Sequence, residues 1–243
     1  MKPFLFLGTR AEDAAADSEY DAMLRYSGLT ADELQRRRLE LEPLGHVELD
    51  AWCGIILGGG PFNVSDPESE KSPTQRRVEA ELGALADQVI EADFWFLGCC
   101  YGIGTLGVRR GGVVDRMFTE PVSDVTVSLT AAGSADQLLG VLPSAFEAFV
   151  GHKEAVRQLP AGAVLLASSP TCPTQAFRIG ERVYATQFHP ELDAEGLCTR
   201  VDAYRDYGYF APAETERLKA MARAAEVTEP ARLLARFVEL AAL

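Results

Sequence analysis

Residues 93–104 read DFWFLGCCYGIG, an apolar run followed by a turn of glycines and cysteines. The run Phe94–Leu97 is typical of a buried strand, and the frame G-x-C-x-G that follows centres on Cys100. A side chain at the tip of a tight strand-to-helix turn is exposed at the carboxyl end of a sheet. Bulky residues two positions to either side would clash, which explains Gly98 and Gly102. The stretch predicts an α/β sheet with a cysteine at its carboxyl edge; the alternative is a glycine-rich turn without chemistry.

The two cysteines of this turn are expected to differ. Cys100 should begin a helix, and a helix N-terminus favours a thiolate, so we expect a lowered pKa for its thiol. Cys99 should point the other way, into the packing behind the turn.

Strand and helix patterns alternate along the chain. Helical patterns cover Ala15–Tyr26 and Thr74–Glu91, and Asp124–Leu129 alternates polar and apolar residues like an antiparallel strand near an edge. This alternation predicts an α/β fold with a doubly wound, mostly parallel sheet and flanking helices. We expect one domain, with a core at 1–195 and a helical C-terminal extension at 196–243. The expected buried strands are Pro3–Leu7, Gly54–Leu57, Phe94–Leu97, Ala163–Ala167 and Arg182–Phe188.

Composition narrows the function classes. Of 243 residues 47% are hydrophobic, enough for a substantial core, and the formal net charge is -13. An acidic surface repels phosphate backbones, so no nucleic-acid partner is expected. The short basic clusters at 36–38, 76–77 and 109–110 are expected to be solvated helix faces or turns.

The cysteines and the apolar runs bear on metal, membrane and compartment. The five cysteines lack paired C-x-x-C spacing, so neither a metal nor another cofactor is expected. The first residues read as a strand, not a secretory signal, and no apolar run approaches the length that spans a membrane. We therefore expect a cytoplasmic protein with reduced thiols and no membrane partner.

A second candidate segment is Gln187–Glu191, which contains His-Pro-Glu directly after an expected strand. A cysteine nucleophile needs a base that accepts its proton and later protonates the leaving nitrogen, and histidine has a suitable pKa. A carboxylate beside the ring would hold one tautomer, and Glu191 is two residues from His189. A lone histidine is usually structural, but the order of these motifs favours a catalytic role for Cys100, His189 and Glu191.

A third segment, Gly58–Pro61, follows the apolar run Ile55–Leu57. Glycine amides can approach a reacting carbonyl and stabilise an oxyanion. One of Gly59 or Gly60, together with the amide of Tyr101, is expected to form an oxyanion hole. Phosphate binding is a weaker alternative because no G-K-[ST] follows. A further alternative is a turn with no chemical role.

Together these segments resemble the class I glutamine amidotransferases, the Cys-His-Glu triad family, and most closely the glutaminase domain of GMP synthase and its stand-alone relatives. The segment Gly151–Pro160 is similar to the family's histidine-containing turn. The resemblance implies a flavodoxin-like fold and hydrolysis of the glutamine side-chain amide through a γ-glutamyl thioester, with release of ammonia. It also implies that Gly151 and His152 lie on the substrate side, although a structural turn histidine is an equal alternative for His152.

Two departures from the family pattern matter. Many members carry a glutamine that helps hold the substrate where this chain has Gly104, so Gly104 marks the substrate-binding position, and a small γ-glutamyl conjugate is an alternative substrate. The chain also lacks an S-G-G-x-D-S pyrophosphatase loop, so ammonia would pass to a separate synthase subunit or be released. A non-catalytic regulatory protein is a further alternative.

Two minor groups complete the expectations. His46 is expected to be structural, on a strand pattern with Leu44, Val47 and Leu49. Aromatic residues after the last motif are expected mainly to pack against the domain: Tyr204, Tyr207, Tyr209 and Phe210.

Overall fold

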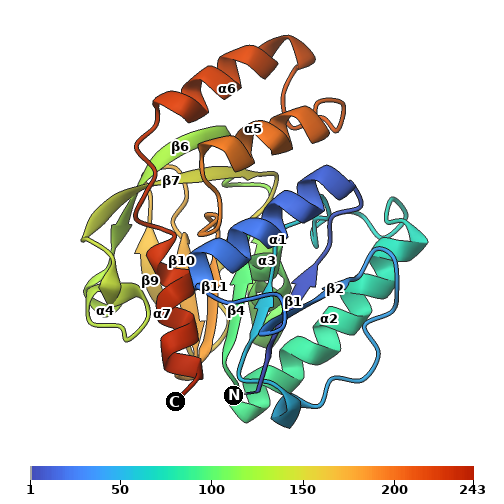
Figure 1. Cartoon of the computed structure of the whole chain (residues 1–243), viewed down its shortest axis with the longest axis vertical. Helices are drawn as coiled ribbons and strands as arrows, with labels where there is room; N and C mark the ends of the chain where they lie inside the picture. Colours follow the sequence, from blue (N-terminus) through green and yellow to red (C-terminus); the bar gives the residue numbers. More distant parts are fainter. Residues whose placement is uncertain (1) are drawn as a thin grey trace.

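The computed structural model describes residues 2–243. Within them nine strands form one mixed sheet in the order β2-β1-β3-β4-β11-β10-β9-β6-β7, and β5 pairs with β8 (Figure 1). The strands are β1 (Phe4–Gly8), β2 (Leu34–Arg38), β3 (Ile55–Leu57), β4 (Phe96–Cys99), β5 (Val113–Asp115), β6 (Glu120–Leu129), β7 (Ala145–His152), β8 (Ala155–Gln158), β9 (Ala163–Ser168), β10 (Ala176–Ile179) and β11 (Val183–Thr186). The α-helices are α1 (Asp13–Ser27), α2 (Pro73–Ala92), α3 (Tyr101–Gly107), α4 (Ala131–Ser134), α5 (Ala194–Ala203), α6 (Thr215–Ala224) and α7 (Arg232–Ala241).

The sheet has a parallel half and an antiparallel half. Strands β2, β1, β3, β4 and β11 pair in parallel, whereas β10, β9, β6 and β7 continue the sheet in antiparallel fashion. The predicted α/β sheet with flanking helices is confirmed. The antiparallel excursion expected at Asp124–Leu129 lies within β6, next to the edge strand β7.

The central strands are apolar on both sides because helices cover both faces. In β1, Phe4 and Phe6 pack into one core, which includes residues of α1 and α7, while Leu5 and Leu7 pack into the other, beneath α2 and α3. Helix α2 begins with a Ser72 cap, whose side chain accepts the amide hydrogen of Gln75. Burial on both faces fixes the strand ends that carry the candidate site.

The chain after β11 forms α5, α6 and α7. Figure 1 shows α5 and α6 together beyond one end of the sheet, whereas α7 lies across a face of the sheet. Apolar residues of α5 and α6 share a small core with Phe149 of β7. The division into a core at 1–195 and an extension at 196–243 stays a prediction. In the described part of the chain, no helix combines the length and apolar character needed to cross a membrane.

Two local predictions are wrong. The arginines at 36–38 lie on the edge strand β2, parallel to β1, and not on a helix face or turn; Arg36 lies over the ring of Tyr20, 4.6 Å from its centroid. The segment around His46 contains no strand. Pairing with a buried neighbour decides a strand more than local composition does, and β1 offers that edge to residues 34–38 alone.

Candidate active site

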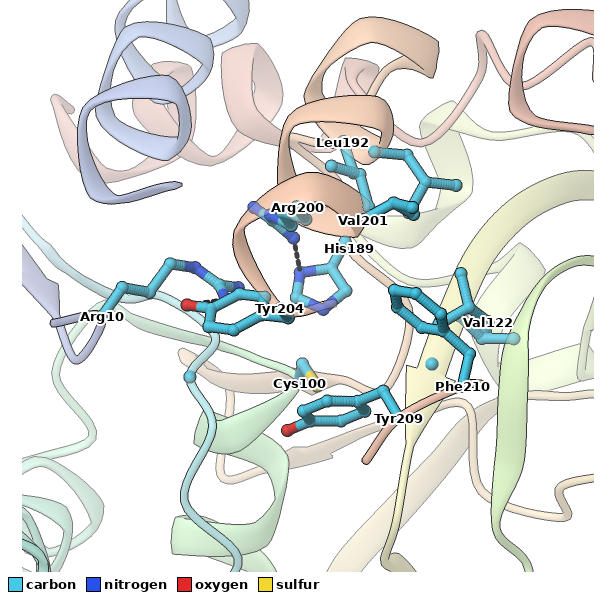
Figure 2. Close-up of a pocket in the computed structure, with 14 residues that line it drawn as sticks. Arg10, Cys100, Val122, His189, Leu192, Arg200, Val201, Tyr204, Tyr209 and Phe210 are labelled. Carbon is cyan, nitrogen blue, oxygen red and sulfur yellow. Dashed lines mark hydrogen bonds between the residues drawn. The ribbon is translucent and has the colours of Figure 1, made fainter. Parts of the chain in front are cut away.

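Four segments converge where parallel strands end. Arg10 follows β1, Gly58–Gly60 follows β3, Cys100 follows β4 and His189 follows β11. These strands are neighbours in the sheet, so their carboxyl ends meet at one edge. Side chains far apart in the sequence therefore lie around one space, and Cys100 and His189 line the same cavity (Figure 2).

The Cys100 turn has a strained backbone. Cys100 has φ 52° and ψ -88°, a conformation that non-glycine residues rarely adopt. Its amide donates to the carbonyl oxygen of Thr186 at 2.8 Å, which ties the turn to β11. A Cβ atom on Gly98 would lie 2.9 Å from the carbonyl carbon of Gly102, so the two glycines let the chain double back closely. Such strain persists only where the surroundings enforce it, often at functional sites.

The ring of His189 is held on one side. Its Nδ1 lies 2.9 Å from Oε1 of the fully buried Glu191. Among residues 2–243 no hydrogen bond reaches Nε2 of this ring. The predicted local pairing of His189 with Glu191 is thus present in the geometry, and it leaves one nitrogen free for a proton on its way to or from another group.

Charged residues from two helices surround this pair. Arg200 of α5 donates from Nη2 to Glu191 Oε1 at 2.6 Å, and its Nη1 lies 3.0 Å from His189 Nδ1. Glu19 of α1 pairs with Arg200 at 3.2 Å and with Arg10 at 3.1 Å. Because Nδ1 cannot donate to Glu191 and accept from Arg200 at once, the charged carboxylate is the stronger partner for its proton.

The electrostatics of the site favour uncharged Cys100 and His189. Burial raises the pKa of the Cys100 thiol to about 12, although Arg10 and Arg200 oppose the change. The expected lowering of this pKa is therefore wrong, because loss of water outweighs the nearby positive charges. Burial lowers the pKa of His189 to about 4, with Glu191 opposing and Arg200 adding to the shift. Burial opposes ionisation of Glu191, but His189 and Arg200 outweigh it and lower its pKa.

The glycine loop lies against the histidine. A Cβ on Gly59 would be 2.5 Å from His189 Cε1 and 2.8 Å from Arg10 Nη2, so only glycine fits. The Gly59 amide donates to Glu19 Oε1 at 3.2 Å, whereas Gly60 lies on the cavity beside Cys100. Between the two expected oxyanion donors the geometry therefore favours Gly60. The amide of Tyr101 belongs to the first turn of α3, where helix N–H groups have no partner within the helix.

Two cavities reach Cys100 from different sides. The first has a volume of about 60 Å³ and includes His189 and a largely apolar wall (Figure 2). The second has a volume of about 20 Å³ and includes polar residues, among them Asn63, Lys153 and Glu154. Both are bordered by Gly60, Cys100, Gly151 and Tyr209.

The substrate-side candidates have different surroundings. Gly151 borders both cavities, and His152 borders the second. His152 has both ring nitrogens engaged, Nε2 with Glu120 at 2.7 Å and Nδ1 with the carbonyl oxygen of Glu154 at 2.8 Å. Its geometry fits the structural alternative.

Gly104 is packed against a carboxylate. A Cβ at this position would lie 2.8 Å from Glu154 Oε1, so no larger residue fits without movement. The Glu154 carboxylate accepts the amides of Val64 at 2.9 Å and Ser65 at 2.8 Å, and burial raises its pKa. Glu154 thus occupies the space next to residue 104 and anchors the loop that continues from the glycine turn.

The model of one protein family, glutamine amidotransferase class-I, matches residues 24–196. The chain belongs to the class-I glutamine amidotransferase family. The matched range includes the Cys100 turn, the glycine loop and His-Pro-Glu, but not Arg10, Glu19 or Arg200.

Named relatives agree with this family. The chain is 31% identical to one subunit of the glutamine-hydrolysing GMP synthase of Thermoplasma acidophilum over 147 residues, covering 60% of this chain and 66% of the relative. It is 33% identical to the GMP synthase of Acinetobacter baylyi over 143 residues, covering 57% of this chain but 23% of that longer protein. The chain thus spans about two thirds of the first relative and about a quarter of the second.

Solved structures share the fold. A glutamine amidotransferase from Thermotoga maritima superposes with a TM-score of 0.77 at 18% identity, covering 99% of this chain and 98% of that one. The structure of a GMP synthase subunit from Thermoplasma acidophilum gives a TM-score of 0.65 at 21% identity, covering 100% and 95%. The flavodoxin-like, class-I amidotransferase architecture predicted from the sequence is confirmed.

Two buried groups of this family member bring potential metal ligands within 4.8 Å of one another: Glu120, His152 and Cys172, and Glu19, His189 and Glu191. In the second, the guanidinium of Arg200 already contacts both carboxylates and would repel a cation. In the first, Glu120 already accepts hydrogen bonds from His152, Thr171 and Gln175. In both groups the carboxylates thus already have charged or hydrogen-bonding protein partners.

Sequence reasoning missed Arg10, Glu19, Arg200 and the cavity role of Tyr209. A signal existed for Glu19, because Ala15, Glu19 and Met23 share one buried face of α1 at helical spacing. A charge on such a face needs a buried partner. Nothing local to the sequence indicates that the partner is Arg200 on α5.

Proposed function

We propose that this chain hydrolyses the side-chain amide of glutamine, with Cys100 as nucleophile. The Cys100 thiol attacks the amide carbon while His189 accepts its proton through Nε2. His189 then protonates the leaving nitrogen, ammonia departs, and water cleaves the γ-glutamyl thioester. Glu191 holds the ring in the tautomer that keeps Nε2 free.

One observation carries the proposal: the ring of His189 is tied at Nδ1 to buried Glu191 and has an unpartnered Nε2, on the cavity that Cys100 also lines. The resting pair is a neutral thiol and a neutral imidazole, because burial moves both pKa values away from the charged forms. Substrate binding must therefore trigger proton transfer. Developing negative charge on the carbonyl oxygen is stabilised by the amides of Gly60 and Tyr101.

The polar cavity suits the head of an amino acid. Lys153 and Glu154 offer opposite charges on its wall, complementary to an α-carboxylate and an α-ammonium group. Lys153 also lies over the ring of Tyr209, 4.2 Å from the centroid, and donates to the backbone oxygen of Tyr207. We propose that the γ-glutamyl group binds here, with its carbonyl carbon at Cys100.

The relatives' names suggest where the ammonia goes. The Thermoplasma acidophilum relative is one part of a glutamine-hydrolysing synthase, and we propose that this chain has a partner of its own, a separate synthase subunit that accepts the ammonia. A second candidate substrate, a small γ-glutamyl conjugate, is favoured by Gly104, where Glu154 takes the space of the glutamine that many family members carry.

The test is covalent capture. A diazoketone analogue of glutamine should add one label to Cys100, located by peptide mass spectrometry, and Cys100→Ser should abolish both the label and ammonia release. Cys99→Ser is the matched control, because Cys99 is fully buried behind the turn and should leave labelling at residue 100 intact. Undiminished labelling of Cys100→Ser at another residue would refute the assignment.

A further inference from the structure

The first cavity has a feature that hydrolysis of glutamine itself does not use. Arg10, Arg200 and Tyr204 line part of it, but six apolar side chains also line it, from β6, β7, the segment after His189, α5 and the segment before α6: Val122, Val150, Leu192, Leu197, Val201 and Phe210. Figure 2 shows Val122, Leu192, Val201 and Phe210 on the same side of the cavity as His189. Ammonia is small and polar, and would leave this apolar surface unfilled.

The position of His189 indicates which cavity lies on the side of the leaving group. The group that protonates the leaving nitrogen must lie on the leaving side of the scissile bond. His189 borders the first cavity and not the second, whereas Glu154, Lys153 and Tyr101 border the second and not the first. If the glutamyl head occupies the polar cavity, the substituent on the leaving nitrogen must point into the apolar one.

Of the described residues, Tyr209 is the one aromatic side chain found in the linings of both cavities. Burial raises the pKa of its hydroxyl, and the nearby Cys100 thiol raises that pKa further. Tyr209 and Phe210 belong to the segment between α5 and α6, and Figure 2 shows the Tyr209 ring next to Cys100. Tyr209 and Phe210, which were expected mainly to pack against the domain, therefore also line the space beside the nucleophile.

We propose that the preferred substrates are γ-glutamyl amides whose nitrogen carries an apolar substituent, an alkyl or aryl group seated in the first cavity. This inference rests on the proposed function and names its substrate class. The C–N bond breaks as the Cys100 sulfur forms the thioester; the amine leaves with the proton that His189 took from the thiol. Water then hydrolyses the thioester, giving glutamate and the free thiol.

The experiment measures glutamate release from glutamine and from its γ-N-methyl, γ-N-ethyl and γ-N-butyl amides. We expect kcat/KM to rise about fourfold for each methylene that enters the cavity. Equal or falling values along the series, with glutamine cleaved normally, would overturn the inference and leave the amidase proposal standing. No glutamate from any substrate, together with no label on Cys100, would instead overturn the proposed function.

Two variants tie the preference to the cavity. Phe210→Ala, in a partly exposed loop position, should lower the ratio of kcat/KM for the butyl amide to that for glutamine about tenfold. Val122→Thr keeps the side-chain shape but adds a hydroxyl, and should lower the same ratio if Phe210→Ala proves unstable. Tyr207→Ala is the control, since Tyr207 lies in the same segment but borders neither cavity. An unchanged ratio in both cavity variants would contradict the placement of the substituent.

Discussion

Residues 2–243 contain two buried histidine–carboxylate pairs with different surroundings. The His189 cluster (Glu19, His189, Glu191, Arg200) and the His152 cluster (Glu120, His152, Cys172, Gln175) each join a ring nitrogen to a glutamate oxygen, at 2.9 Å and 2.7 Å. In the His152 cluster both ring nitrogens are engaged. In the His189 cluster one nitrogen carries all the contacts, and the ring borders the cavity of Cys100.

A buried histidine paired with a carboxylate therefore does not by itself indicate a catalytic site. Chemistry needs a ring nitrogen that can exchange a proton with a reacting group, and a satisfied ring has none to offer. The His152 pair instead cross-links the start of β6 to the end of β7, at the register position where Glu120 faces His152. We therefore propose a role in the reaction for the His189 cluster alone, whereas the His152 pair holds strands together.

Replacement of either histidine by glutamine tests the contrast between the two clusters. His189→Gln should lower kcat for glutamine about 10⁴-fold, since the amide cannot act as a base. His152→Gln should leave kcat within a few-fold but lower the free energy of unfolding by about 3 kcal/mol, because it disturbs a buried pair. Steady-state kinetics and urea unfolding of both variants measure the two quantities. A His152→Gln enzyme that folds normally and has lost its activity would reverse the assignment.

The lowered pKa of His189 should also make the free energy of unfolding depend on pH. The pKa of His189 falls from its ordinary 6.5 to about 4 in the folded protein. Below pH 6.5 the unfolded chain binds a proton that the folded ring still refuses, so stability is lost as the pH falls towards 4. This group alone should account for about 3 kcal/mol.

Denaturant unfolding between pH 6.5 and 4 measures this loss of stability in the parent, in His189→Gln and in His152→Gln. The comparison shows whether stability falls with pH and whether His189 causes the fall. His189→Gln should flatten the part of the slope between pH 6.5 and 4, whereas His152→Gln should keep it. Equal slopes in the parent and in His189→Gln would show that the ring titrates normally in the folded protein.

Most of the features predicted correctly from the sequence depend on short local motifs. The turn at Gly98–Gly102 follows from steric rules within five residues, and the pairing of His189 with Glu191 spans only two. The parallel sheet follows from apolar runs that must be buried on both faces. These features could be predicted because the residues that determine them are neighbours in the chain.

The remainder depends on contacts between distant segments. The edge strand β2 is charged and becomes a strand only because β1 pairs with it. The raised pKa of Cys100 reflects burial by several elements, which no motif encodes. The partnership of Glu19 with Arg200 joins α1 to α5 across 181 positions of sequence. Such features required the structure.

Arg200 contributes a buried positive charge to the His189 cluster, and its replacement should have a modest effect on activity. Its guanidinium contacts both Glu191 and the ring of His189, and its charge helps to lower the pKa of His189. Arg200→Gln should therefore raise that pKa, move the acidic limb of kcat/KM to higher pH and lower kcat about tenfold. We regard Arg200 as a positioning residue, which acts on substrate only through His189 and Glu191.

The pH profile separates this role from simple scaffolding. Arg200→Lys keeps the charge and should keep the limb near its parental position, even where kcat falls. Arg25→Gln is the matched control, because Arg25 forms an exposed pair with Asp193 whose loss costs about 1 kcal/mol or less. A purely structural Arg200 would lower stability in both Arg200 variants and shift the limb in neither. A shift of the acidic limb in Arg200→Gln but not in Arg200→Lys would show that the buried positive charge keeps His189 unprotonated.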